Sequence, residues 1–195
     1  MTIAIDGSLG EGGGQVLRTS LSLSVVTGKT LRITNIRANR SQPGLKHQHL
    51  QAVQAAAAIC QADVEGSSLG STSINFKPGS VQGGQYRFSI PTAGSASLVL
   101  QTVFYPLAFA ERGSQVSVQG GTHVRWSPCF HYLEQQWLPY LKRMGYQATL
   151  TLQKTGYYPK GGGEIRARIQ PGPGQKALRL IERGDLVHVR GLAAV

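Results

Sequence analysis

A glycine-rich segment, GEGGGQVLR from Gly10 to Arg18, runs directly into an apolar stretch with the spacing of a helix. Glycines ahead of a helix leave backbone N–H groups free to face an anion such as phosphate. The segment is not a Walker A loop, because no Lys-Ser or Lys-Thr pair closes it, and Gln15 stands where a dinucleotide fingerprint needs glycine. Glu11 would repel phosphate unless a divalent metal bridged the two. A tight turn without a ligand stays open as the alternative.

The polar segment NIRANRSQPGLKHQHLQAV, residues 35–53, supplies a cluster of cations. Arg37, Arg40 and Lys46 lie in or just after one loop, and Arg18 joins them if the first helix packs close by. Four cations could bind a terminal phosphate, for which the arginine fork is well suited. A loop whose charges are simply solvated is the competing interpretation.

The five histidines form no obvious metal site. His47 and His49 are two residues apart, so on a helix they point to different faces and at most one faces a given site. His123, His131 and His188 carry no signal when taken singly, and a structural role is the simpler interpretation for each.

A third segment, KTGYYPKGGGEIR from Lys154 to Arg166, predicts a hairpin with a Pro-Lys-Gly-Gly-Gly turn. Tyr157, Tyr158 and Lys160 would give its tip aromatic and basic character, which suits stacking on nucleic-acid bases. An ordinary turn remains the alternative. With nine acidic residues in total and no Ser/His/Asp pattern, hydrolase chemistry based on two carboxylates has little support.

Composition points to a globular domain with an anionic partner. The 195 residues carry 20 Lys and Arg against nine Asp and Glu, a formal net charge of +11. Such an excess favours a polyanion, most commonly nucleic acid, although it could also serve solubility alone. No apolar run is long enough to span a bilayer, so we expect no membrane partner. Cys60 and Cys129 form no CxxC pair, which fits a reducing cytoplasm rather than zinc or disulfides.

The elements that would position these residues recur along the chain. VLRT at 16–19 returns as VLQT at 99–102, 83 residues later. Each copy contains strand, small-residue turn, helix, strand, polar loop, helix and two closing strands. We expect strands at residues 2–6, 31–36, 73–76, 86–90, 115–119, 148–153 and 164–169, and helices at 15–26, 45–61, 98–110 and 128–144. Gly28, Gly113 and Gly145 are expected to end three of the helices.

This order predicts an α+β fold of tandem β-α-β-α-β-β repeats with helices packed on one face of small sheets. The predicted units are residues 1–85, residues 86–170, and a linker with the start of an incomplete third repeat at 171–195. The strand at 86–90 is expected to close the first copy and open the second. New strand, including His188, is expected after the PGPGQK linker.

Four blocks resemble the RNA 3′-terminal phosphate cyclases in the right order: IDGSLGEGGGQVLRTSLSLSVVTGKTLRITNIRANRSQPGLKHQHLQAV, GSASLVLQTV, GGTHVRWSP and GYYPKGGGE. The resemblance implies repeated β-α-β-α-β-β units with a small domain inserted in the third. It also implies a reaction that depends on ATP and a divalent metal (Mg or Mn). A histidine takes AMP from ATP and passes it to the 3′-terminal phosphate of RNA, and the adjacent 2′-hydroxyl displaces AMP to form a 2′,3′-cyclic phosphate.

The resemblance also implies roles for individual residues. Glu11 matches a glutamate of the metal and nucleotide site, while Gln101 and Pro128 match positions lining the ATP pocket. The polar positions around the phosphate site are matched by Arg18, Arg37, Arg40 and His49.

In this family the nucleophilic histidine lies in a carboxy-terminal block, which the resemblance places beyond Val195, and none of the five histidines here matches it. We therefore expect a truncated or split member, or an amino-terminal portion, that is inactive by itself. The alternative is a non-catalytic RNA-binding relative, since the family includes members that act in ribosome biogenesis. The retained Glu11 favours the cyclase branch. The oligomeric state is left open.

Overall fold

A computed structural model describes residues 1–10, 12–172 and 174–193. The first repeat consists of β1 (Thr2–Asp6), α1 (Gly14–Thr27), β2 (Thr30–Thr34), α2 (His47–Cys60), β3 (Asp63–Glu65) and β4 (Ile74–Lys77). The second consists of β5 (Gln85–Ser89), α3 (Ala96–Ala108), β6 (Ser114–Gly120), α4 (Phe130–Tyr132), η1 (Leu133–Trp137), α5 (Leu138–Arg143), β7 (Gln147–Lys154) and β8 (Gly163–Gln170). The predicted α+β class with two β-α-β-α-β-β repeats is confirmed.

The two sheets have the same topology, with strand orders β1-β2-β4-β3 and β5-β6-β8-β7. In each, the first two strands are parallel and the remaining pairings are antiparallel. The expectation that one strand serves both copies is wrong, because β5 pairs only within the second sheet. The short β3, which was not predicted, completes the first sheet instead. Three residues are too few to show a period-2 pattern.

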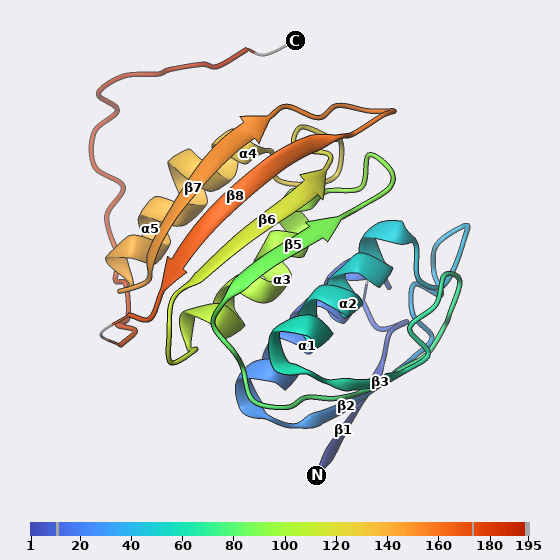
Figure 1. Cartoon of the computed structure of the whole chain (residues 1–195). Coiled ribbons are helices and arrows are strands. Elements are labelled where there is room, and N and C mark those ends of the chain that lie inside the picture. The colour runs from blue at the N-terminus through green and yellow to red at the C-terminus, as the bar shows by residue number, and fades with distance from the viewer. Residues whose placement is uncertain (11, 173, 194–195) are drawn as a thin grey trace.

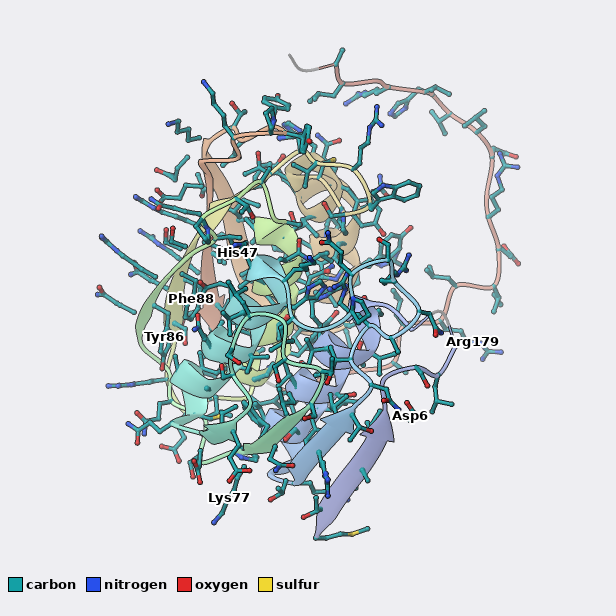
Figure 2. All side chains as sticks on the ribbon, turned by 90° about the vertical axis from the view of Figure 1, so that its right-hand side faces the viewer. Asp6, His47, Lys77, Tyr86, Phe88 and Arg179 are labelled. Carbon is teal, nitrogen blue, oxygen red and sulfur yellow. The ribbon has the colours of Figure 1, made fainter. Side chains whose placement is uncertain are left out.

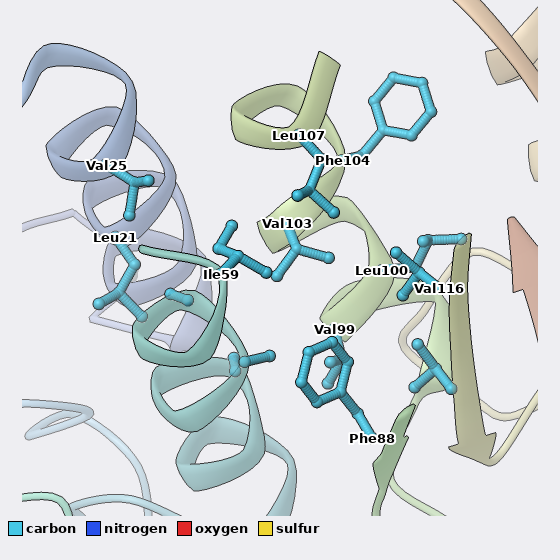
Figure 3. Packing of buried hydrophobic residues seen from close by; sticks show 14 of the residues in the cluster. Leu21, Val25, Ile59, Phe88, Val99, Leu100, Val103, Phe104, Leu107 and Val116 are labelled. Atoms are coloured by element: carbon cyan, nitrogen blue, oxygen red, sulfur yellow. The ribbon is translucent and has the colours of Figure 1, made fainter. Parts of the chain in front are cut away.

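The helices α1, α2 and α3 form a layer between the two sheets, and each sheet turns its other face to solvent (Figure 1). In Figure 3, Leu21 of α1 and Ile59 of α2 lie next to the side of α3 that carries Val103 and Leu107. The other side of α3 packs against the second sheet. The buried apolar residues of both repeats form one hydrophobic cluster.

Helix ends follow local chemistry, with two differences from expectation. Gly28 ends α1 in the left-handed region at φ 67°, as predicted. The helix α3 ends at Ala108, before Gly113, and contains Pro106, whose ring removes a backbone N–H donor near that end. The helix expected at 128–144 is interrupted by the π-helical turn η1. Pro139, the second residue of α5, cannot donate to the carbonyl four residues earlier, which favours a local change of helical register.

Residues 174–193 form no helix or strand, so the strand expected there, including His188, is wrong. A strand needs a neighbour to satisfy its backbone N–H and C=O groups, and no described strand pairs with this segment. The predicted third unit includes Val195, which lies outside the described residues. The placing of the nucleophilic histidine beyond Val195 stays a prediction. In the described part of the chain, no helix is both long and apolar enough to cross a membrane.

Candidate phosphate-binding site

The start of α1 differs from the start of α3 in how its backbone is capped. Gly13 precedes α1 and supplies no side-chain cap. In α3 the Ser95 hydroxyl accepts a hydrogen bond from the Leu98 N–H at 3.3 Å. In α2 the Nδ1 atom of His49 accepts from the Lys46 N–H at 3.3 Å. Unlike α3, α1 therefore has first-turn N–H groups with no side-chain acceptor among the described residues, and these can face an anion.

Gly13 and Gly14, at the start of α1, let the backbone approach Arg18, Arg40 and His49 closely. A Cβ atom at Gly14 would lie 2.3 Å from Nε2 of His49 and 2.7 Å from Nη1 of Arg18. A Cβ atom at Gly13 would lie 3.0 Å from Nη2 of Arg40. The glycine segment thus lies directly against Arg40 of the loop 35–46 and against His49 and Arg18.

Two arginines make this site strongly positive. Arg18 is partly buried, donates to Oε1 of Gln15 at 3.1 Å, and burial lowers its pKa to about 10. Nη1 of Arg37 donates to the carbonyls of Gln42 and Gly44 at 2.7 and 2.8 Å and so holds the loop in place. Burial, and then the charge of Arg40, lowers the pKa of Arg37. Among the described residues, neither Arg18 nor Arg37 forms an ion pair.

His49 is neutral in this surrounding. It is 9% exposed, and burial followed by the charges of Arg37, Arg18 and Lys46 lowers its pKa to about 3. Because Nδ1 accepts the Lys46 N–H, the proton of the neutral ring sits on Nε2, which lies beside Gly14. The ring can donate a hydrogen bond to an anion at the start of α1.

We expect the free energy of unfolding to fall as the pH drops from about 6.5 toward 3. In this range the unfolded chain binds a proton on His49 (ordinary pKa 6.5) while the folded chain does not, so protonation favours unfolding. The loss approaches about 1.4 kcal/mol per pH unit. Urea unfolding at several pH values measures it. His49→Gln should flatten the dependence and His47→Gln should not; an unchanged slope in His49→Gln would contradict the assignment.

A groove of about 480 Å³ separates α1 from α3 and begins at this site. Arg18 and Gln101 both line it, and Leu23, Tyr105 and Phe109 give it apolar walls. Arg18 of the first repeat and Gln101 of the second therefore line the same groove. Pro128 does not line this groove; it lies in the loop between β6 and α4.

Glu11, the carboxylate predicted to hold a metal, lies outside the described residues. Within the described residues, no group of three or more His, Cys, Asp or Glu side chains is placed to hold a metal ion.

Over residues 9–186, the chain matches the model of the family described as RNA 3′-terminal phosphate cyclase. The chain belongs to this family. A relative named RNA 3′-terminal phosphate cyclase from Nostoc punctiforme is 52% identical over 99% of this chain and 58% of its own length. Relatives of that name from Ralstonia nicotianae and Methanopyrus kandleri are 53% and 49% identical over 56% and 54% of their lengths.

The chain thus spans little more than half the length of these curated relatives. Among solved structures, the enolpyruvyl transferase NikO from Streptomyces tendae aligns with 83% of this chain and 30% of its own, at a TM-score of 0.44 and 14% identity. That likeness is too low to bear on fold or function.

The second repeat of this cyclase-family chain contains a pair of histidines that sequence reasoning missed. Nε2 of His123 lies 3.0 Å from Nδ1 of His131, and Tyr157 stacks on His123 with ring centroids 5.4 Å apart. Tyr157 is therefore half-buried rather than free at the hairpin tip, whereas Tyr158 is 82% exposed. The repeat could have drawn attention to this histidine pair, because the loop after β6 in the second repeat corresponds to the cationic loop after β2 in the first.

Proposed function

We propose that this chain supplies the RNA-phosphate site and part of the nucleotide site of an ATP-dependent RNA 3′-terminal phosphate cyclase, which converts an RNA 3′-phosphate into a 2′,3′-cyclic phosphate. The proposal rests on family membership and on one observation. Cations and a neutral imidazole donor gather at the side-chain-uncapped start of α1. A terminal phosphate carries more charge than a bridging one and is the ligand that this arrangement suits.

Each residue of the site would have a role that follows from its position. The N–H groups at the start of α1 and the Arg18 guanidinium would bind the phosphate, and Nε2–H of His49 would orient it. Arg37 acts mainly on the loop, because Nη1 is engaged by two carbonyls. By neutralising the phosphate, these groups would let the 2′-hydroxyl approach it.

The groove between α1 and α3 fits a nucleotide in its chemistry. Its apolar walls suit a base, Gln101 offers a polar group, and Arg18 stands where the groove meets the phosphate site. When bound, ATP supplies AMP as the activating group. Glu11 remains the proposed metal ligand, on the family resemblance alone.

We further propose that no histidine of this chain is the nucleophile that accepts AMP. Nδ1 of His49 is engaged by the Lys46 N–H, and the low pKa of its ring makes it a weak base. His123 and His131 are hydrogen-bonded to each other. For His47 and His188 the proposal rests on the family resemblance alone, in which neither matches the nucleophile. The chain by itself is therefore expected neither to adenylylate itself nor to cyclise RNA.

Incubation of the purified chain with α-labelled ATP and Mg or Mn tests this expectation. We expect no protein-bound label after denaturation. Stoichiometric label that disappears when any one of the five histidines, His188 included, is replaced by alanine would overturn it.

RNA ending in a 3′-phosphate is expected to bind about 10-fold more tightly than the same RNA ending in a 3′-hydroxyl, because hydrogen bonds to a charged group contribute about 1.5–3 kcal/mol. Fluorescence titration of labelled oligonucleotides at fixed salt measures the ratio. RNA of the same sequence with its phosphate moved to the 5′ end is the control for charge. Equal affinity for all three would leave only non-specific attraction, as expected of a non-catalytic RNA-binding relative.

A further inference from the structure

The solvent-facing surfaces of the two sheets differ in charge, although the sheets share one topology. In the first sheet, exposed strand residues comprise two cations and three carboxylates: Arg32, Lys77, Asp6, Asp63 and Glu65. In the second sheet, the outward strand residues comprise four cations and one carboxylate: Arg87, Lys154, Arg166, Arg168 and Glu164. The excess of positive charge in the described strands therefore lies on one sheet.

The strand register places these cations among neutral polar side chains. Arg87 on β5 is beside Ser117 on β6, which is beside Arg166 on β8. In the next row, Arg168 lies beside Gln115. The intervening side chains are hydrogen-bonding groups that complement phosphate and ribose oxygens without reading a base.

This face is hollowed rather than convex. A depression of about 400 Å³ lies over β5, β6, β8 and β7, and its lining includes Arg87, Arg166 and Arg168 but no acidic residue. Figure 2 shows long side chains standing out on the side of the molecule where Tyr86 and Phe88 of β5 are labelled. A chain of phosphates could therefore lie along the face.

The arginines differ in their availability. Nε of Arg166 donates to Oε1 of Glu164 at 2.6 Å, and that carboxylate also accepts from Ser117 at 2.8 Å. These hydrogen bonds, led by the one from Arg166, lower the pKa of Glu164. Arg87 and Arg168 form no hydrogen bond or ion pair with any described residue. The two free guanidinium groups can contact a ligand without breaking an existing interaction.

We propose that the outer face of the second sheet binds the phosphate backbone of the RNA substrate, away from its 3′ end and without regard to sequence. The choice of RNA rests on the proposed function; the charge of the face stands independently of it. A second copy of this chain is a poor occupant, because charged residues are depleted from the centres of protein interfaces and this surface offers no exposed apolar patch among the described strand residues.

The test compares two double variants that each remove two positive charges. Arg87→Gln with Arg168→Gln alters the second sheet, and Arg32→Gln with Lys77→Gln alters the first. Each is titrated with single-stranded RNA of about 20 nucleotides and of five nucleotides, with 3′-phosphate and 3′-hydroxyl ends, at several salt concentrations. Thermal melting checks that both variants remain folded.

For the long RNA, we expect the second-sheet variant to lose about tenfold in affinity near 0.1 M salt. The negative slope of log K against log salt should become shallower by about 1.4, which is about 0.7 for each of two lost phosphate contacts. The first-sheet variant should change affinity less than twofold. Five-nucleotide RNA should be nearly unaffected, and the ratio between the two 3′ ends should stay as in the wild type.

Equal losses in the two variants, or no loss in either, would overturn the proposal. A loss confined to the 3′-phosphate RNA would assign these arginines to the end site instead and would also overturn it. If the parent chain did not distinguish the two 3′ ends, the proposed function would fail, while a selective loss in the second-sheet variant would still support backbone binding here.

Discussion

Replacing Arg18 by methionine is expected to lower the affinity for RNA with a 3′-phosphate by about 10-fold without destabilising the protein. A hydrogen bond to a charged group contributes about 1.5–3 kcal/mol to binding, and methionine cannot make one. Methionine does fill a similar volume. Because Arg18 is partly buried, lacks an ion pair among the described residues and has a lowered pKa, its charge costs folding free energy that methionine avoids.

The two readouts are therefore expected to move in different directions. RNA titration should show the loss for the 3′-phosphate, with little change for the 3′-hydroxyl, and urea unfolding should show equal or greater stability. Arg32→Met, on the exposed face of β2, is the control and should alter neither by much. If Arg18→Met bound both RNAs like the wild type, Arg18 would have no part in the phosphate site.

Phe104→Ala is expected to lower the free energy of unfolding by about 3–5 kcal/mol, the usual cost of emptying a buried aromatic site. Phe104 is fully buried on α3, and its ring contacts Trp137, Tyr105 and Tyr146 at centroid distances of 4.7, 5.5 and 6.1 Å. The side chain joins α3 to Trp137 of η1 and to Tyr146, the residue before β7, so the cavity cannot close without moving them.

Phe109→Ala provides the matched comparison, because the same residue type directly after the same helix is 50% exposed. We expect it to cost under about 1 kcal/mol, as is usual for surface positions. Chemical denaturation of both variants measures the difference. Similar losses at the two positions would mean that α3 is not packed as described.

The repeat and most of its elements could be predicted because their causes are local. Alternating apolar residues define β6 and β8, and Gly28 ends α1 through its own backbone preference. The approach of the glycine segment to Arg40 follows from topology, because the segment comes after β1 and Arg40 after β2, at the same ends of two parallel strands.

Other features depend on contacts between elements that are far apart in the sequence, which a local pattern does not indicate. Three-residue β3 exists because β4 offers it an edge, and residues 174–193 form no strand because no described strand pairs with them. The contact between His123 and His131 needs a loop and a helix to converge, so neither residue signals it alone. Arg37 was predicted as a phosphate ligand, but only its contacts with Gln42 and Gly44 show how far it also serves the loop.

The core shared by the two repeats determines how the chain loses its structure. Ile59 of the first repeat and Val103 of the second belong to one buried cluster, so neither sheet keeps its inner face covered without the other. Repeats that touch only their neighbours can melt in stages. Here we expect the two copies of one motif to melt as a single cooperative unit, so that calorimetry shows one transition whose van't Hoff and calorimetric enthalpies agree.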